Sequence, residues 1–238
     1  RVNEKIDFWR ASALQGYLQA LATEGLGADD VTFVDLPVEA PYIGNVSASA
    51  NGPLFDARQA AASARAETFA LIRGEVDAIY NYGASGPSLQ AFLGAQVVAD
   101  INHHPDQKVA INNGTPNVLT VSGALVREHP DLVARYLAQV LRATAWARAH
   151  RQEATRIIAA EVSVVEEWVP DAFDDALFDN LEPSLRPDLV HALRVRKDFL
   201  LAHGFIQPDF SIDDWITPEP LAAAQRLLAH DVNQARAA

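Results

Sequence analysis

The chain has 238 residues, 49% of them hydrophobic and 21% charged, which is the composition of a folded globular protein with one large domain or two small ones. Its formal net charge of −12 argues against binding to nucleic acids or anionic membranes, because both require a cationic surface. The absence of cysteine excludes disulfides, thiolate catalysis and cysteine-ligated metals from this sequence.

The chain starts at Arg1 and contains no methionine, so we expect a fragment or a chain whose beginning was removed. No stretch is long and apolar enough to cross a bilayer, and no secretory signal opens the sequence. A signal would be lost together with a removed beginning, so the compartment does not follow from these observations.

A helix is predicted close to the start of the chain. Apolar residues recur there at the spacing of one helix face, at Leu14, Tyr17, Leu18 and Leu21. Ser12 is expected to cap the amino end of this helix, and Gly25 is expected to end it.

Strands and helices are predicted to alternate up to about residue 101. Apolar segments over 31–36, 76–80 and 96–101 read as strands, and an Ala-rich helix is expected over 56–73 after a loop over 37–53. Such alternation predicts parallel strands joined by right-handed helical crossovers.

The second half of the sequence is predicted to be mostly helical. Residues 103–116 read as a linker and 118–126 as one extended strand, after which nearly everything is helical. Pro130 and Pro187 each stand where a first helical turn is expected, because a missing N–H costs nothing there. Gly204 is expected to end the helix that Pro187 opens.

The first candidate ligand site consists of Arg10, Ala11 and Ser12. A strand-like segment is expected to end there and a helix to begin, so unpaired N–H groups and the positive helix end would attract an anion. Arg10 would add a bidentate contact to that anion. A purely structural interpretation, with Ser12 as a cap and Arg10 in solvent, fits the sequence equally well.

The second candidate ligand site consists of Asn81, Tyr82 and Gly83. These residues follow the predicted strand over 76–80, at the edge where open α/β sheets bind ligands. An aromatic ring with one amide suits a mostly apolar pocket, and the glycine turn would free backbone N–H groups for a ligand. A plain connecting turn explains Gly83 equally well.

The remaining polar clusters do not predict a catalytic or metal site. His103 and His104 point in opposite directions on an extended chain and lack further ligands at useful spacing, so we interpret them as a surface linker. The acidic residues over 171–179 do not follow the spacing of a calcium loop and read as a solvated helix face. We therefore expect no metal, no cofactor and no catalytic residue within this sequence.

Four segments resemble the periplasmic solute-binding proteins of the nitrate, sulfonate and taurine type. They are residues 12–31, 69–78, 126–133 and 200–215, in the family's order and spacing. The resemblance implies a two-lobed, type II periplasmic-binding-protein-like α/β fold. Residues 1–105 would form the second lobe with its parallel sheet, and 106–238 the hinge return and the helix-rich part of the first lobe.

The resemblance also implies a function. A small organic anion, such as a sulfonate, would bind in an interlobe cleft, and the chain would be the substrate-binding component of an ABC-type uptake system with a permease as partner. The alternative is a sulfinate desulfinase on the same fold, because residues 36–69, 120–126 and 145–148 are similar to such enzymes. The catalytic residues of those enzymes would lie in an amino-terminal part that this sequence lacks.

A transport protein would be periplasmic or membrane-associated, and a desulfinase cytoplasmic. A truncated domain without activity of its own is the third interpretation.

Overall fold

The structure is a computed structural model that describes residues 8–36, 66–81, 83–111, 117–162, 164–173 and 176–237. The chain forms two compact units. The first unit is drawn from residues 1–81, 97–115 and 195–209, and the second from 82–96, 116–194 and 210–238. The domain boundary expected near residue 105 stays a prediction.

The first unit is organised around helix α1 (Phe8–Thr23), which confirms the helix predicted near the start of the chain. The backbone of Gly25 is left-handed, with φ +72°, and the N–H of Leu26 bonds back to the carbonyl of Leu21. A glycine adopts this conformation without the steric cost that other residues incur, so it ends the helix as expected. The short 3₁₀ helix η1 (Ala28–Asp30) follows.

Helix α1 is closely covered by the ring of Tyr80. A Cβ atom added at Gly16 would lie 2.5 Å from one carbon of that ring, so the two elements touch only because residue 16 has no side chain. The N–H of Tyr80 donates to the hydroxyl of Tyr17 over 2.7 Å, and the two tyrosine rings meet edge to face. Tyr80 and the backbone before it are thereby fixed on α1.

The predicted strands are not present as strands in the part of the chain that the structure describes. Residues 31–36, 76–80 and 96–101 are non-helical there but join no β-ladder. A strand is defined by a neighbour that pairs with its N–H and C=O groups, and no such neighbour lies among the described residues. The helix predicted over 56–73 is present where it is described, over 66–72, while residues 37–65 lie outside the described part.

The prediction of one extended strand over 118–126 is wrong. Residues 117–122 are non-helical, but helix α5 (Gly123–Glu128) begins at the next residue. The Oγ atom of Ser122 accepts the N–H of Leu125 over 3.2 Å, which is the bond of an N-cap. The apolar alternation therefore stops where a serine caps a helix.

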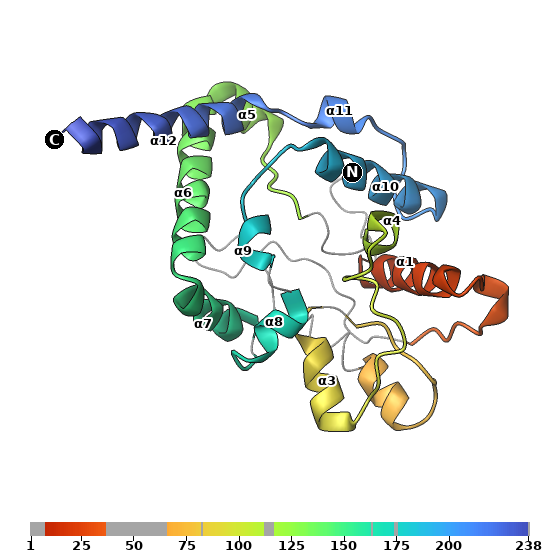
Figure 1. The fold of residues 1–238 in the computed structure, drawn as a ribbon. Helices are drawn as coiled ribbons and strands as arrows, with labels where there is room; N and C mark the ends of the chain where they lie inside the picture. Colours follow the sequence, from red (N-terminus) through yellow and green to blue (C-terminus); the bar gives the residue numbers. More distant parts are fainter. Residues whose placement is uncertain are drawn as a thin grey trace. The chain divides into compact units, whose positions relative to one another are not determined.

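The second unit has its main helical crossing between α6 (Pro130–Ala149) and α12 (Glu219–Ala237). Pro130 occupies the first turn of α6, as predicted. Figure 1 shows α12 crossing α6 close to the α5 end, and the two helices share a small core of Ala138, Leu141 and Ala224.

Shorter helices complete both units. In the second unit, α7 (Arg151–Val162) and α9 (Leu177–Asn180) meet α6 in a cluster around Phe178, and α3 (Ser85–Leu93) packs on α8 (Trp168–Phe173). That unit also contains α11 (Ile212–Trp215), and the first unit contains α4 (Gln107–Ala110). Helix α10 (Pro187–Ala202) has residues in both units, and it starts at Pro187 as predicted.

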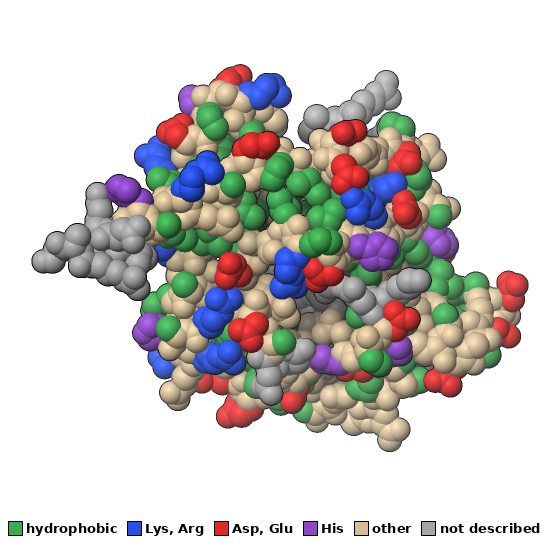
Figure 2. Space-filling view, turned by 45° about the horizontal axis from the view of Figure 1, so that its top comes forward, with side chains coloured by type: hydrophobic (Ala, Val, Ile, Leu, Met, Phe, Trp, Pro, Cys, Tyr) green, Lys and Arg blue, Asp and Glu red, His purple; other side chains and the backbone are tan. Residues whose placement is uncertain are grey.

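The surface carries both signs of charge. On the face shown in Figure 2, Lys and Arg side chains are interspersed with Asp and Glu. Within the described ranges, no helix combines the length and apolar character that a membrane crossing requires.

Candidate functional site

Arg10, Ala11 and Ser12 all lie inside helix α1. The interpretation of Ser12 as its N-cap is wrong, because the helix begins at Phe8 and Ser12 falls in the second turn. The guanidinium of Arg10 is exposed and forms an ion pair with Asp35, with 2.9 Å between Nη1 and Oδ1. Ala11 and Ser12 are fully buried. Arg10 therefore already has a carboxylate partner, whereas Ser12 faces the interior of the first unit.

Asn81 and Gly83, from the second candidate ligand site, belong to different units. Asn81 belongs to the first unit, where it follows the buried Tyr80. Tyr82 lies outside the described residues. Gly83 belongs to the second unit and has φ +62°, a left-handed conformation that favours glycine, in the turn that leads into α3. Contacts of these residues with a ligand stay predictions.

A polar cluster of three side chains joins α1 to the carboxyl-terminal half of α10. We call Ser12, Gln15 and Arg196 the Arg196 cluster. The Nη2 of Arg196 donates to Ser12 Oγ over 3.1 Å, and its Nη1 donates to Gln15 Oε1. Ser12 and Gln15 are 0% and 2% exposed, so these bonds lie within the packed part of the first unit.

The amide of Gln15 is held in one orientation. Its Nε2 donates to the carbonyl of Ile111 over 2.9 Å, and the Nε2 of Gln19 donates to the same carbonyl over 2.7 Å. Ile111 is fully buried. Because the amide nitrogen is engaged there, the Oε1 oxygen is the atom that Gln15 presents to Arg196.

The charge of Arg196 has no carboxylate partner among the described residues. Its hydrogen-bond acceptors, a hydroxyl and an amide, are both neutral. Burial lowers the pKa of Arg196 below its ordinary value, and the nearby Tyr80 partly opposes this shift. The ring of Phe199 lies 5.9 Å from the guanidinium carbon and adds a weak cation–π contact. The cluster therefore holds a half-buried positive charge that no carboxylate of the described residues neutralises.

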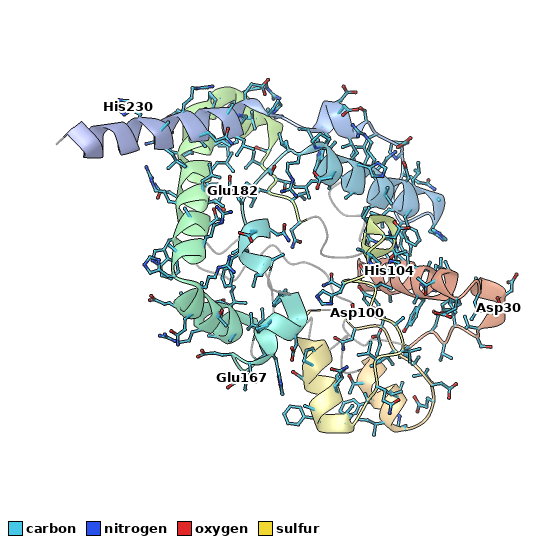
Figure 3. All side chains as sticks on the ribbon, viewed as in Figure 1. Asp30, Asp100, His104, Glu167, Glu182 and His230 are labelled. Carbon is cyan, nitrogen blue, oxygen red and sulfur yellow. The ribbon has the colours of Figure 1, made fainter. Side chains whose placement is uncertain are left out.

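His103 and His104 take part in local turns. The Nδ1 of His103 lies 2.7 Å from Asp100 Oδ2, and the backbone N–H of Asp106 donates to Nδ1 of His104. The pKa of Asp100 is lowered: partial burial opposes the shift, but the bonds from His103 and from the N–H of Asn102 outweigh it. Figure 3 labels Asp100 and His104. Over the described ranges, no three His, Asp or Glu side chains are grouped so that they could hold a metal.

Tyr17, which supports Tyr80 on α1, gives the first testable prediction. Burial, with a smaller electrostatic contribution from Glu67, raises the pKa of Tyr17 to about 12, although the N–H of Tyr80 acts in the opposite direction. The resulting stabilisation is present below pH 10 and is lost as the pH rises from 10 through 12, since the unfolded chain ionises first. We expect the free energy of unfolding to fall more steeply over that range in the wild type than in Tyr17→Phe. Urea denaturation at several pH values measures both slopes, and parallel curves would contradict the prediction.

Sequence reasoning found Ser12 but missed Gln15 and Arg196. Ser12, Gln15 and Gln19 recur at i, i+3 and i+7 on α1, so a polar stripe on one helix face was a readable signal of buried hydrogen bonding. Nothing in the sequence pairs this stripe with Arg196, which is 184 positions away from Ser12.

Comparison with known proteins places the chain in a family. The family model described as NMT1/THI5 like matches residues 30–154, more than half of the sequence. The chain belongs to the NMT1/THI5-like family. Two relatives of the chain are the 2'-hydroxybiphenyl-2-sulfinate desulfinases of Rhodococcus erythropolis and Rhodococcus qingshengii. Each is 33% identical to the chain over 218 residues, covering 89% of it and 55% of the relative.

Two solved structures of the desulfurization enzyme DSZB resemble this NMT1/THI5-like chain. One has a TM-score of 0.67 at 29% identity and covers 90% of this chain and 63% of its own. The other, a cysteine-to-serine variant in complex with biphenyl-2-sulfinic acid, has a TM-score of 0.65 at 30% identity, with 85% and 56% covered. The resemblance read from the sequence is confirmed, and the chain spans about half the length of the curated relatives it matches.

Proposed function

We propose that this chain is part of a protein that binds a small organic anion, and that an aryl sulfinate or sulfonate is the class of ligand. The observation that carries the proposal is the 33% identity, over 89% of the chain, with enzymes named for an aryl sulfinate. The structural neighbour in complex with biphenyl-2-sulfinic acid supports the same ligand class. The contacts predicted for Arg10, Ala11, Ser12, Asn81, Tyr82 and Gly83 belong to this proposal. So does an interlobe position for the ligand.

In the first form of this proposal, the protein is the binding component of an uptake system and delivers the anion to a permease. In the second form, it is a desulfinase that releases sulfite from the sulfinate. The second form rests on the desulfinase names of the curated relatives, and the first on the match to the NMT1/THI5-like family. These 238 residues contain no cysteine, so a thiolate mechanism would need residues beyond them.

Binding of a defined panel to the full-length protein tests the proposal. Titration calorimetry would compare biphenyl-2-sulfinate, biphenyl-2-sulfonate, taurine and nitrate with the neutral 2-phenylbenzyl alcohol. We expect the aryl anions to bind at least about tenfold more tightly than the neutral alcohol, because a charge-assisted contact is worth more than a neutral one.

Analysis of the products after incubation with biphenyl-2-sulfinate separates the two forms of the proposal. A binding component retains biphenyl-2-sulfinate unchanged, whereas a desulfinase adds water across the carbon–sulfur bond and releases biphenyl and sulfite. Sulfite can be measured directly by its reaction with a disulfide reagent. Failure of every organic anion in the panel to bind would contradict the proposed function as a whole.

A further inference from the structure

We propose that Arg196, positioned by Ser12 and Gln15, provides a charged contact to the anionic group of the ligand, in addition to the contacts expected from the sequence. This inference rests on the proposed function and assigns its anionic contact to a residue at the far end of the sequence.

The charge of Arg196 differs from that of the paired arginines. The guanidinium groups of Arg10, Arg148 and Arg194 each pair with a carboxylate. Their side chains are 39–59% exposed, so water screens these charges and they need a partner less than a buried charge does. Arg196 is half-buried and pairs with no carboxylate in the described part of the chain. Since a buried charge is costly unless it is paired, an external anion has the most to gain at this position.

The hydrogen bonds of Arg196 leave donors for a ligand. A guanidinium group has five N–H groups, and two of those of Arg196 are used by Ser12 and Gln15. The other three make no hydrogen bond to the described residues. A neutral hydroxyl and a neutral amide fix the plane of the group without cancelling its charge, so the remaining N–H groups keep their full attraction for an anion.

The geometry of the cluster favours an anion with two adjacent oxygens. Arginine presents its donors as a planar fork, which matches the paired oxygens of a sulfinate, sulfonate or carboxylate. The group is also oriented in advance, because the Gln15 amide is fixed by the carbonyl of the fully buried Ile111. The aromatic ring of Phe199 beside the guanidinium supplies an apolar neighbour for an aryl ligand.

Arg196→Gln in the full-length protein tests this assignment. Glutamine is long and polar but lacks the charge, so we expect the affinity for biphenyl-2-sulfinate to fall by at least about tenfold. The affinity for the neutral 2-phenylbenzyl alcohol should stay unchanged. Arg194→Gln is the matched control on the same helix, because Arg194 already pairs with Asp213, and it should leave both affinities as in the wild type.

The outcomes separate this inference from the proposed function. If the wild type binds biphenyl-2-sulfinate and Arg196→Gln binds it equally well, the assignment of Arg196 is wrong while the proposed function stands. An equal loss for the anionic and the neutral probe would show that Arg196 only maintains the fold, which also overturns the assignment. If no organic anion binds the wild type, both proposals fail together.

A second variant covers the case in which Arg196→Gln does not fold. Arg196→Lys keeps the positive charge but replaces the planar fork with a point charge. We expect a loss of affinity for biphenyl-2-sulfinate that is smaller than that of the glutamine variant, with no loss for 2-phenylbenzyl alcohol. If Arg196→Lys binds biphenyl-2-sulfinate with wild-type affinity and with the same dependence of that affinity on salt, the positive charge alone is sufficient for binding. The proposed role of the planar fork would then be wrong.

Discussion

Leu141→Ala is expected to lower the free energy of unfolding by about 2–5 kcal/mol. Leu141 is 6% exposed and lies in the core that α6 and α12 share, next to Ala138 and Ala224. The two buried neighbours are alanines, whose single methyl groups are fixed to the helix backbone and cannot move into the space that the leucine leaves. The partly buried Leu137, Leu221 and Leu228 that pack against this core can fill only part of it, so a cavity would remain.

Leu132→Ala on the same helix is the matched control. Leu132 is 47% exposed, so the same change removes far less buried surface, and we expect a loss below about 1 kcal/mol. Chemical denaturation followed by far-ultraviolet circular dichroism measures both variants against the wild type. Equal losses would contradict the crossing of α6 and α12 as the main core of the second unit.

The helices show how much of the fold local sequence determines. Pro130 and Pro187 open helices as predicted, and Gly25 ends α1 as predicted. These signals are local, because a missing N–H or a left-handed backbone acts on its own turn. Helix ends are therefore readable without knowledge of the rest of the chain.

The predicted strands show what local sequence does not determine. The apolar segments over 31–36 and 96–101 have the composition of strands, yet they pair with no strand among the described residues, and Val98 is 90% exposed. The composition of a segment indicates that it is compatible with a β-strand. A sheet forms only if a second strand, often distant in the sequence, pairs with it. Residues 117–122 add a second cause, because the helix that follows is set by the Ser122 cap.

The candidate site was predictable in part for the same reason. Ser12 was singled out, but as the cap of a helix that in fact starts at Phe8. Its observed role, as an acceptor for Arg196, depends on how α10 is placed against α1 within the first unit. Residue spacing along one helix carries no information on that placement.

Gly16→Ala is expected to destabilise the first unit by about 1–3 kcal/mol, although alanine usually stabilises a helix interior. The new Cβ atom would lie 2.5 and 2.6 Å from two carbons of the Tyr80 ring, far inside van der Waals contact. The ring cannot turn away easily, because Tyr80 is buried and its N–H is bonded to Tyr17. Either α1 or the Tyr80 backbone must shift.

Gly86→Ala is the matched control, since Gly86 is also helical and a Cβ atom there meets nothing within 4 Å. We expect this variant to be as stable as the wild type or slightly more stable, by up to about 1 kcal/mol. Thermal melting of both variants gives the comparison, and a stabilised Gly16→Ala would contradict the packing of Tyr80 on α1.

The same substitution connects stability with the proposed ligand contact. Tyr80 contributes to the electrostatic environment of Arg196, and Ser12 and Gln15 lie on the same helix as Gly16. A shift of α1 away from Tyr80 would therefore move both acceptors that orient the guanidinium. Because a bidentate contact depends on that orientation, Gly16→Ala should weaken binding of biphenyl-2-sulfinate more than binding of 2-phenylbenzyl alcohol, even in the folded fraction.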